Sequence, residues 1–178
     1  SVSSDGSAKG VVQIGTAGTA EPLLTATAKT YAQFYSIGAS DETYSLSING
    51  TQTASFVLGA DNINDAVAKI NLIKETTGVS AAVSAGGKIL LQDMDGDDIT
   101  IENTATGKNL AVQALNHDGQ TAAGNPISLG ASDGNDSTRI MGSLKTSSPK
   151  DYTITQSGTL ASGYFQTQRA AIENISFF

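Results

Sequence analysis

Cysteine and tryptophan are absent from the 178-residue chain, and histidine occurs once, at His117. Without cysteine, a disulfide scaffold, a thiol nucleophile and a cysteine-ligated zinc site are all excluded. One histidine cannot build a two-histidine metal cluster, although it is enough for a lone general base. No apolar run approaches the roughly 18–20 residues that cross a bilayer.

The sequence is also short of charge, above all of positive charge. Charged residues make up 15% of the chain, below the roughly 25% of an average domain. Ten Lys and Arg stand against seventeen Asp and Glu, for a net charge of −7, which argues against a surface that follows nucleic-acid phosphates. Glycine, serine and threonine replace the missing charges, and such a neutral, hydroxyl-rich surface is common outside the cell.

Both ends of the sequence are unusual. The chain begins at Ser1, without a methionine, a basic segment or an apolar segment of the kind found in signal peptides. It ends on two aromatic residues, Phe177 and Phe178. We therefore expect a processed product or a piece cut from a longer protein.

A β-hairpin is predicted over residues 43–58. Tyr44, Leu46 and Ile48 alternate with polar residues, which is typical of a half-buried strand. Asn49 and Gly50 follow and supply the two positive φ angles of a type I′ turn. Residues 51–58 then return as the partner strand.

The hydrophobic period changes after residue 60. Ile63, Val67 and Ile70 are spaced as one face of a helix, so we expect a helix over residues 62–76. Gly78 suits the left-handed position that ends a helix.

Alternation resumes immediately after the predicted helix. Three antiparallel strands are predicted at residues 79–83, 89–91 and 99–101, with turns between them. The helix would cover one face of this small sheet.

The flanking segments are less regular. Residues 22–37 favour a strand, although a short helix over 26–34 also fits. Residues 104–149 are rich in loops. Shorter strands are expected at 10–14, 109–115, 127–129 and 151–156, and a helical tail at 165–178.

The order of segments between residues 44 and 101 resembles the flagellin IN motif. The similarity rests on residues 46–50 (LSING), 67–71 (VAKIN), 77–83 (TGVSAAV), 89–91 (ILL) and 99–101 (ITI). The pair that names the motif would be Ile70 and Asn71. The acidic turn at residues 93–98 departs from the pattern, and the flanks, residues 1–40 and 108–178, carry no resemblance that we assign.

The resemblance implies the central variable (D2/D3) region of a bacterial flagellin. That region lies on the outer surface of an extracellular filament used in motility, and its partners are other flagellin subunits, bound mainly through terminal helices absent here. The implied fold is α+β and β-rich, with small antiparallel sheets and one covering helix in a ββαβββ unit. We place this IN-motif subdomain at residues 38–107 and a loop-rich β subdomain at 1–37 and 108–178. A filament cap or hook-associated protein, which shares the motif, is the nearest alternative.

Chemical sites are few in the sequence. Asp93, Asp95 and Asp97 have the alternate spacing that suits Ca²⁺, but glycine and glutamate are not where an EF-hand needs them, so a solvated turn is favoured. The turn at residues 133–136 is interpreted in the same way. His117 and Asp118 suggest a hydrolase dyad, yet no Gly-X-Ser-X-Gly elbow accompanies them. We therefore predict no catalytic, cofactor-binding or metal-binding residue, and a monomer that binds neither nucleic acid nor membrane.

Modification and adhesion remain as further interpretations. N-glycosylation sequons start at Asn49, Asn135 and Asn174, at a frequency that chance explains. The family makes O-glycosylation a further candidate modification, and the loop hydroxyls open to it are those of Ser132, Ser137, Thr138, Ser147 and Ser148. Tyr31, Phe34 and Tyr35 suggest either an adhesive patch, as in a carbohydrate- or host-binding adhesin, or ordinary packing.

Overall fold

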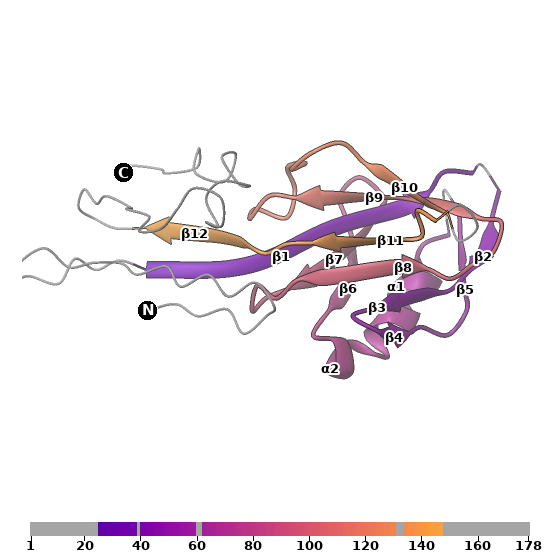
Figure 1. Cartoon of the computed structure of the whole chain (residues 1–178), viewed down its shortest axis with the longest axis horizontal. Coiled ribbons are helices and arrows are strands. Elements are labelled where there is room, and N and C mark those ends of the chain that lie inside the picture. Colours follow the sequence, from indigo (N-terminus) through magenta and orange to yellow (C-terminus); the bar gives the residue numbers. More distant parts are fainter. Residues whose placement is uncertain (1–24, 39, 60–61, 131–133, 148–178) are drawn as a thin grey trace, which may run out of the picture.

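The structure, a computed structural model, describes residues 25–38, 40–59, 62–130 and 134–147. This part of the chain is mostly β, with twelve strands and two short helices (Figure 1). The elements in chain order are β1 (Thr25–Ser36), β2 (Glu42–Tyr44), β3 (Leu46–Ile48), β4 (Thr51–Gln52), β5 (Phe56–Leu58), α1 (Asn64–Asn71), α2 (Lys74–Thr77), β6 (Ser80–Val83), β7 (Ile89–Asp93), β8 (Ile99–Asn103), β9 (Asn109–Leu115), β10 (Ile127–Gly130), β11 (Ser137–Ile140) and β12 (Ser143–Ser147).

The larger sheet is built around β1, whose strand prediction is confirmed. Its strand order is β10-β9-β1-β7-β6, and all neighbours are antiparallel. Phe34 of β1 lies opposite Ile89 on one side and Val112 on the other. Since paired residues share a face, these three side chains form one apolar row toward the core.

The smaller sheet has the strand order β11-β8-β3-β4. The predicted turn is present, with φ of 48° at Asn49 and 80° at Gly50. Each arm of the hairpin is nevertheless divided, because β2 pairs with β5 in a separate two-stranded sheet. The division falls where the Thr53 hydroxyl accepts the Leu46 N–H at 3.1 Å and replaces a main-chain ladder bond.

The expected three-stranded meander is wrong in one respect. β6 pairs with β7, but β8 leaves that sheet and pairs with β3 and β11. The acidic turn at residues 93–98 carries the chain across, because main-chain groups of the turn bind back to Asp93 and redirect the chain between the two sheets. The strands predicted to form one small sheet under a covering helix are therefore divided between two sheets that face each other.

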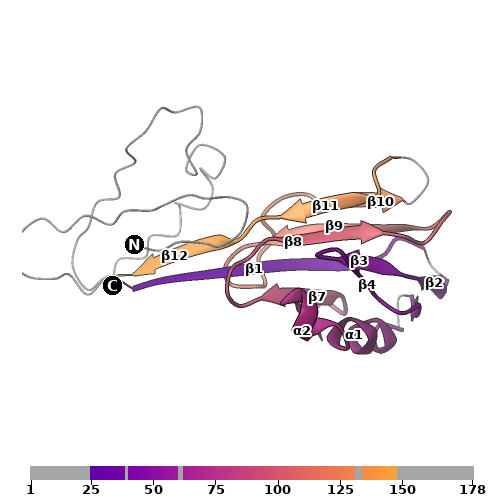
Figure 2. The ribbon, with the colours of Figure 1, turned by 60° about the horizontal axis from the view of Figure 1, so that its bottom comes forward.

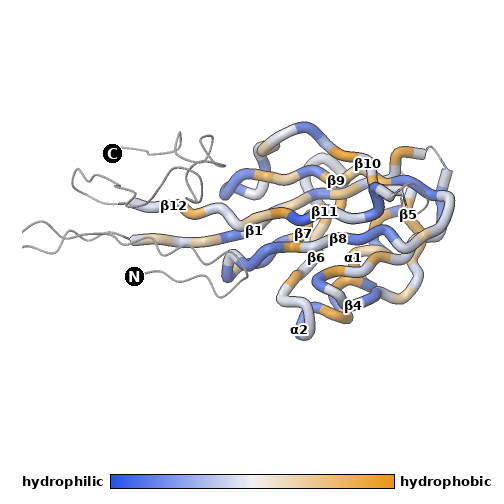
Figure 3. The backbone as a smooth tube through the Cα atoms, viewed as in Figure 1, coloured by the Kyte–Doolittle hydropathy of each residue, from blue (hydrophilic) through white to orange (hydrophobic). Residues whose placement is uncertain are grey.

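One hydrophobic core fills the space between the sheets. It combines side chains from both sheets, from the β2–β5 pair and from α1. Ala66 and Ile70 of the helix are fully buried, and Ile63 and Val67 pack against the same cluster. Figure 2 shows the helices along one side of this body, away from β10 and β11, and Figure 3 shows hydrophilic and hydrophobic residues interspersed along its strands.

The helix predicted over residues 62–76 is two helices. α1 ends at Asn71, and the next residue, Leu72, is 75% exposed. α2 adds a single turn, and Gly78 ends it at φ 75°, as expected. The helix is divided because, within this segment, only the apolar side chains of the first helix and Ile73 pack against the core.

The first five residues of β1 continue beyond the larger sheet and pair with β12, from Thr25↔Ser147 to Lys29↔Ser143. We call the paired residues 25–29 and 143–147 the ribbon, and the rest of the described chain the body. The predicted strands at 109–115 and 127–129 are confirmed as β9 and β10, whereas β11 and β12 lie in a region expected to be loop. The segments predicted at 10–14, 151–156 and 165–178 lie outside the described residues.

The larger sheet combines strands from both of the expected subdomains. β1 and β9 come from the flanking segments and β7 from residues 38–107, yet β1 lies between the other two in one sheet. Their buried side chains belong to the same core cluster.

Candidate functional site

The acidic turn is organised around Asp93, which is 3% exposed. Its Oδ1 atom accepts the N–H groups of Asp95, Gly96 and Asp97 at 2.9, 3.0 and 3.3 Å. This carboxylate therefore closes a turn, as aspartates do when they bind their own backbone a few residues ahead. Among the described residues no group of three or more Asp, Glu or His side chains is arranged to hold a metal ion.

Burial raises the pKa of the Asp93 carboxyl, and the nearby charge of Asp97 raises it further. The three N–H groups act in the opposite direction, because they favour the charged form. The aspartates at positions 95 and 97 are exposed. Their carboxylates face the solvent, while the Asp93 carboxylate holds the turn together.

His117 and Asp118 do not form a catalytic dyad. His117 Nε2 lies 3.2 Å from both the hydroxyl and the carbonyl oxygen of Thr27. The Asp118 carboxylate is turned toward its own loop, where it accepts the N–H groups of Gln120 and Thr121 at 2.8 Å and the Thr121 hydroxyl at 2.5 Å. His117 thus links the β9–β10 connection to the ribbon.

Two of these groups have shifted pKa values. The pKa of the His117 imidazole is lowered, mainly by burial and also by the charges of Lys29 and Lys145, while the Thr27 carbonyl and Asp118 oppose the shift. The pKa of Asp118 is lowered because the Thr121 hydroxyl and the two N–H groups stabilise its charged form. Both shifts follow from packing of the loop.

The sequons differ in their surroundings. Asn49 donates to the Thr77 carbonyl at 2.9 Å and accepts the Thr100 N–H at 2.8 Å. Its amide is therefore occupied in holding the hairpin turn against neighbouring segments. Asn135 is exposed, and Asn174 lies outside the described residues.

The hydroxyls named as modification candidates are partly described. Ser137 and Ser147 are exposed, and Thr138 is half-buried. Ser132 and Ser148 lie outside the described residues.

The three aromatic residues of β1 do not form one patch. Phe34 is fully buried in the core, while Tyr31 and Tyr35 lie on the outer face of the sheet because alternate residues of a strand share a face. Tyr31 is only 9% exposed. Lys88 Nζ lies 4.1 Å from the centroid of the Tyr35 ring. Packing within the protein therefore accounts for Phe34, for Tyr31 and for the buried part of Tyr35.

The Ile-Asn pair of the predicted helix has a clear structural role. Ile70 is fully buried. Asn71 donates its amide N–H to the Ala81 carbonyl and accepts the Ala81 N–H at its Oδ1, both at 2.9 Å. β6 is the last strand of the larger sheet, so one amide side chain takes the place of a missing neighbouring strand at its edge.

An acidic side chain of the same helix makes a similar contact with another strand. Asp65 Oδ2 accepts the Val57 N–H at 2.9 Å, which joins α1 to β5. Sequence reasoning gave Asn71 only the role implied by the family resemblance. The signal it missed was a short polar side chain directly beside a buried residue of the helix, Ala66 for Asp65 and Ile70 for Asn71.

Comparison with known proteins adds no assignment. The chain matches no protein-family model, and no curated protein matches it. None of the described helices is long and apolar enough to span a membrane.

Proposed function

We propose that this chain is the surface-exposed central region of a bacterial flagellin, located in the outer part of the extracellular filament. The task is structural: the domain projects from the filament, sets its surface charge and presents its outer surface. No catalytic activity belongs to this proposal, and we expect purified protein to be inert in hydrolase assays.

The ribbon is the observation that carries the proposal. Thr25 pairs with Ser147, so the chain reaches the body and leaves it along two adjacent strands (Figure 1). This geometry suits a domain inserted into a longer subunit, because two adjacent strands can connect to that subunit at a single point in its chain.

The Ile-Asn pair supports the finer part of the proposal, a flagellin IN-motif unit within residues 38–107. In this chain Ile70 anchors α1 in the core and Asn71 binds both main-chain groups of Ala81. Both residues named by the resemblance therefore take part in attaching α1 to its neighbours.

Immunogold labelling of the bacterium that produces this chain tests the proposal. Antibodies raised against the purified chain should label filaments along their whole length, and filaments removed by shearing should carry the same label. Label confined to the distal tip or to the hook–filament junction would assign the chain to a cap or hook-associated protein. Label on the cell body alone would overturn the flagellar proposal.

Glycan-array binding would separate the adhesin alternative. Since Tyr31 is nearly buried, an adhesive role would depend on Tyr35. Binding that is lost in Tyr35→Ala would favour that alternative.

A further inference from the structure

Two lysines share one face of the ribbon. Thr27 pairs with Lys145 and Lys29 with Ser143, so both lysines lie on the same face as diagonal neighbours. His117 reaches this face from the β9–β10 connection and contacts Thr27. We call Lys29 and Lys145 the cationic patch.

The cationic patch has no ion-pair partner within the described part of the chain. The three ion pairs there involve Lys74, Lys108 and Arg139. Asp118, the carboxylate beside His117, is held by its own loop. The cationic patch is therefore a pair of positive charges without an ion-paired carboxylate among the described residues, in a chain whose net charge is −7.

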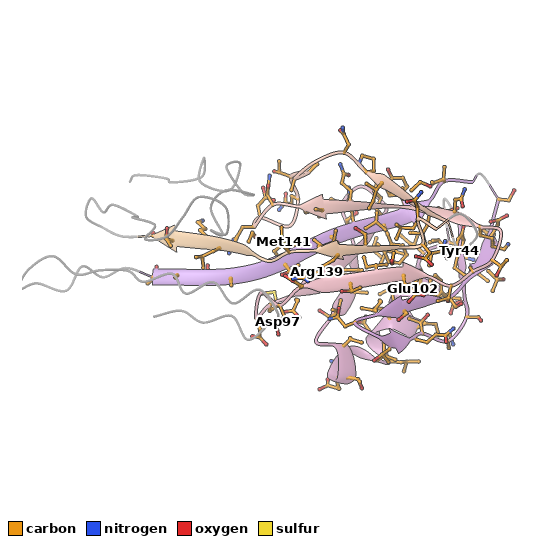
Figure 4. The ribbon with its side chains drawn as sticks, in the orientation of Figure 1. Tyr44, Asp97, Glu102, Arg139 and Met141 are labelled. Atoms are coloured by element: carbon orange, nitrogen blue, oxygen red, sulfur yellow. The ribbon has the colours of Figure 1, made fainter. Side chains whose placement is uncertain are left out.

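The acidic turn lies on the other side of β1. Gly96 packs on Ala28: a Cβ atom placed on this glycine would lie 2.4 Å from the Ala28 Cβ. Ala28 and Lys29 are consecutive and therefore point to opposite faces. Asp95 and Asp97 are exposed in this turn, and Figure 4 shows Asp97 at the end of the body from which the ribbon extends.

We propose that the cationic patch of one copy docks against Asp95 and Asp97 of a second copy. The two surfaces face away from each other on one chain, so they complement each other between molecules. Such a contact joins different surfaces of the two copies and repeats from one copy to the next. The inference goes beyond the proposed function, because it requires no knowledge of where the chain is located.

The contact is weak by its chemistry. Exposed ion pairs contribute little and are screened by salt. The chain is therefore monomeric at micromolar concentration and associates when copies are concentrated to about 1 mM, the effective concentration that a short tether produces.

Sedimentation velocity of the full chain tests the proposal. At about 1 mM protein and about 0.01 M salt, where the Debye length is about 30 Å, the weight-average sedimentation coefficient should rise with concentration. At about 1 M salt, where that length is about 3 Å, the rise should disappear. Carbodiimide crosslinking of mixed light and heavy isotope-labelled chains should join Lys29 or Lys145 to Asp95 or Asp97 of the other copy.

Charge reversal supplies the decisive comparison. Lys29→Glu/Lys145→Glu and Asp95→Lys/Asp97→Lys should each abolish association, and an equimolar mixture of the two variants should restore it, with the two variants alternating along the assembly. Lys69→Glu/Lys74→Glu, on the helices, makes the same change in net charge as the first variant and should associate like the unmodified chain. Circular dichroism checks that every variant is folded.

Three results would overturn the proposal: no concentration dependence at low salt, association that both reversals leave intact, or a mixture that stays monomeric. Heparin-column retention that depends on Lys29 and Lys145, without self-association, would also overturn it and assign the patch to a polyanion.

Discussion

The body and the ribbon share one strand but are stabilised in different ways. From Thr30 onward β1 has buried residues that face the core, whereas none of residues 25–29 or 143–147 is buried. The body is therefore stabilised by hydrophobic burial. The ribbon depends on main-chain pairing and on contacts at its base, and a two-stranded ribbon alone is only marginally stable in water. We expect the ribbon to open locally while the body stays folded.

The largest effect should come from the shared strand inside the body. Phe34 is fully buried between β7 and β9, so Phe34→Ala should cost about 3–5 kcal/mol through lost burial and a cavity. Urea denaturation should show this loss in the free energy of unfolding.

Tyr35→Ala, on the opposite face of the same strand, is the control and should cost clearly less, since that ring is only half-buried. Equal losses in the two variants would contradict the view that burial toward the core dominates the stability of β1.

The next effect should come from the junction of body and ribbon. Gly96 has φ of 84°, and a Cβ atom there would overlap Ala28. Gly96→Ala should therefore cost about 1–3 kcal/mol for overpacking, in addition to about 1–2 kcal/mol for the left-handed backbone. Hydrogen exchange of the ribbon amides should accelerate as well.

Gly87→Ala isolates the packing contribution, because Gly87 has φ of 69° and nothing within 4 Å of its would-be Cβ. The difference between the two variants measures the close approach at Ala28. If they destabilise equally, the turn does not support the ribbon.

A smaller effect should appear at the edge of the larger sheet. Asn71→Ala removes both hydrogen bonds to Ala81 and should cost about 1 kcal/mol. The Ala81 amide should exchange faster by NMR, while the Phe34 amide, in the middle of the same sheet, should change little. Asn64→Ala, at an exposed position of α1, should leave Ala81 protected.

The smallest effect should be a pH dependence of the ribbon. The pKa of His117 is lowered in the folded chain, so the folded state prefers the neutral imidazole. Its contribution is fully present above the unfolded pKa of about 6.5 and is lost as the pH falls through the lower folded value. Hydrogen exchange of the ribbon amides, corrected for intrinsic rates, should speed up in that window.

His117→Gln should remove this dependence. Asp118 cannot imitate it, because its lowered pKa places its own loss of stability at far more acidic pH. A dependence that survives in His117→Gln would exclude the histidine as its source.

The sites were less accessible to sequence reasoning than the turns. The spacing of Asp93, Asp95 and Asp97 is compatible with a cation or with a turn, and the choice depends on where three main-chain N–H groups lie. Asn71 is another such case: its amide meets Ala81 ten residues later only because α1 packs beside β6. The sequence shows the type of side chain at each position, whereas the group to which that side chain binds depends on the tertiary structure.

Local features were fixed by the residues themselves. Asn49 and Gly50 form the expected turn and Gly78 ends a helix, because positive φ angles favour asparagine and glycine. Helical spacing predicted that Ile70 is a core residue, and alternation predicted the strand β1, because the direction of side chains follows the periodicity of the backbone. Tertiary structure alone decided that β8 crosses to the second sheet and that β12 joins β1. Alternation shows which face of a strand is buried, but neighbouring strands are chosen by contacts between residues far apart in the chain.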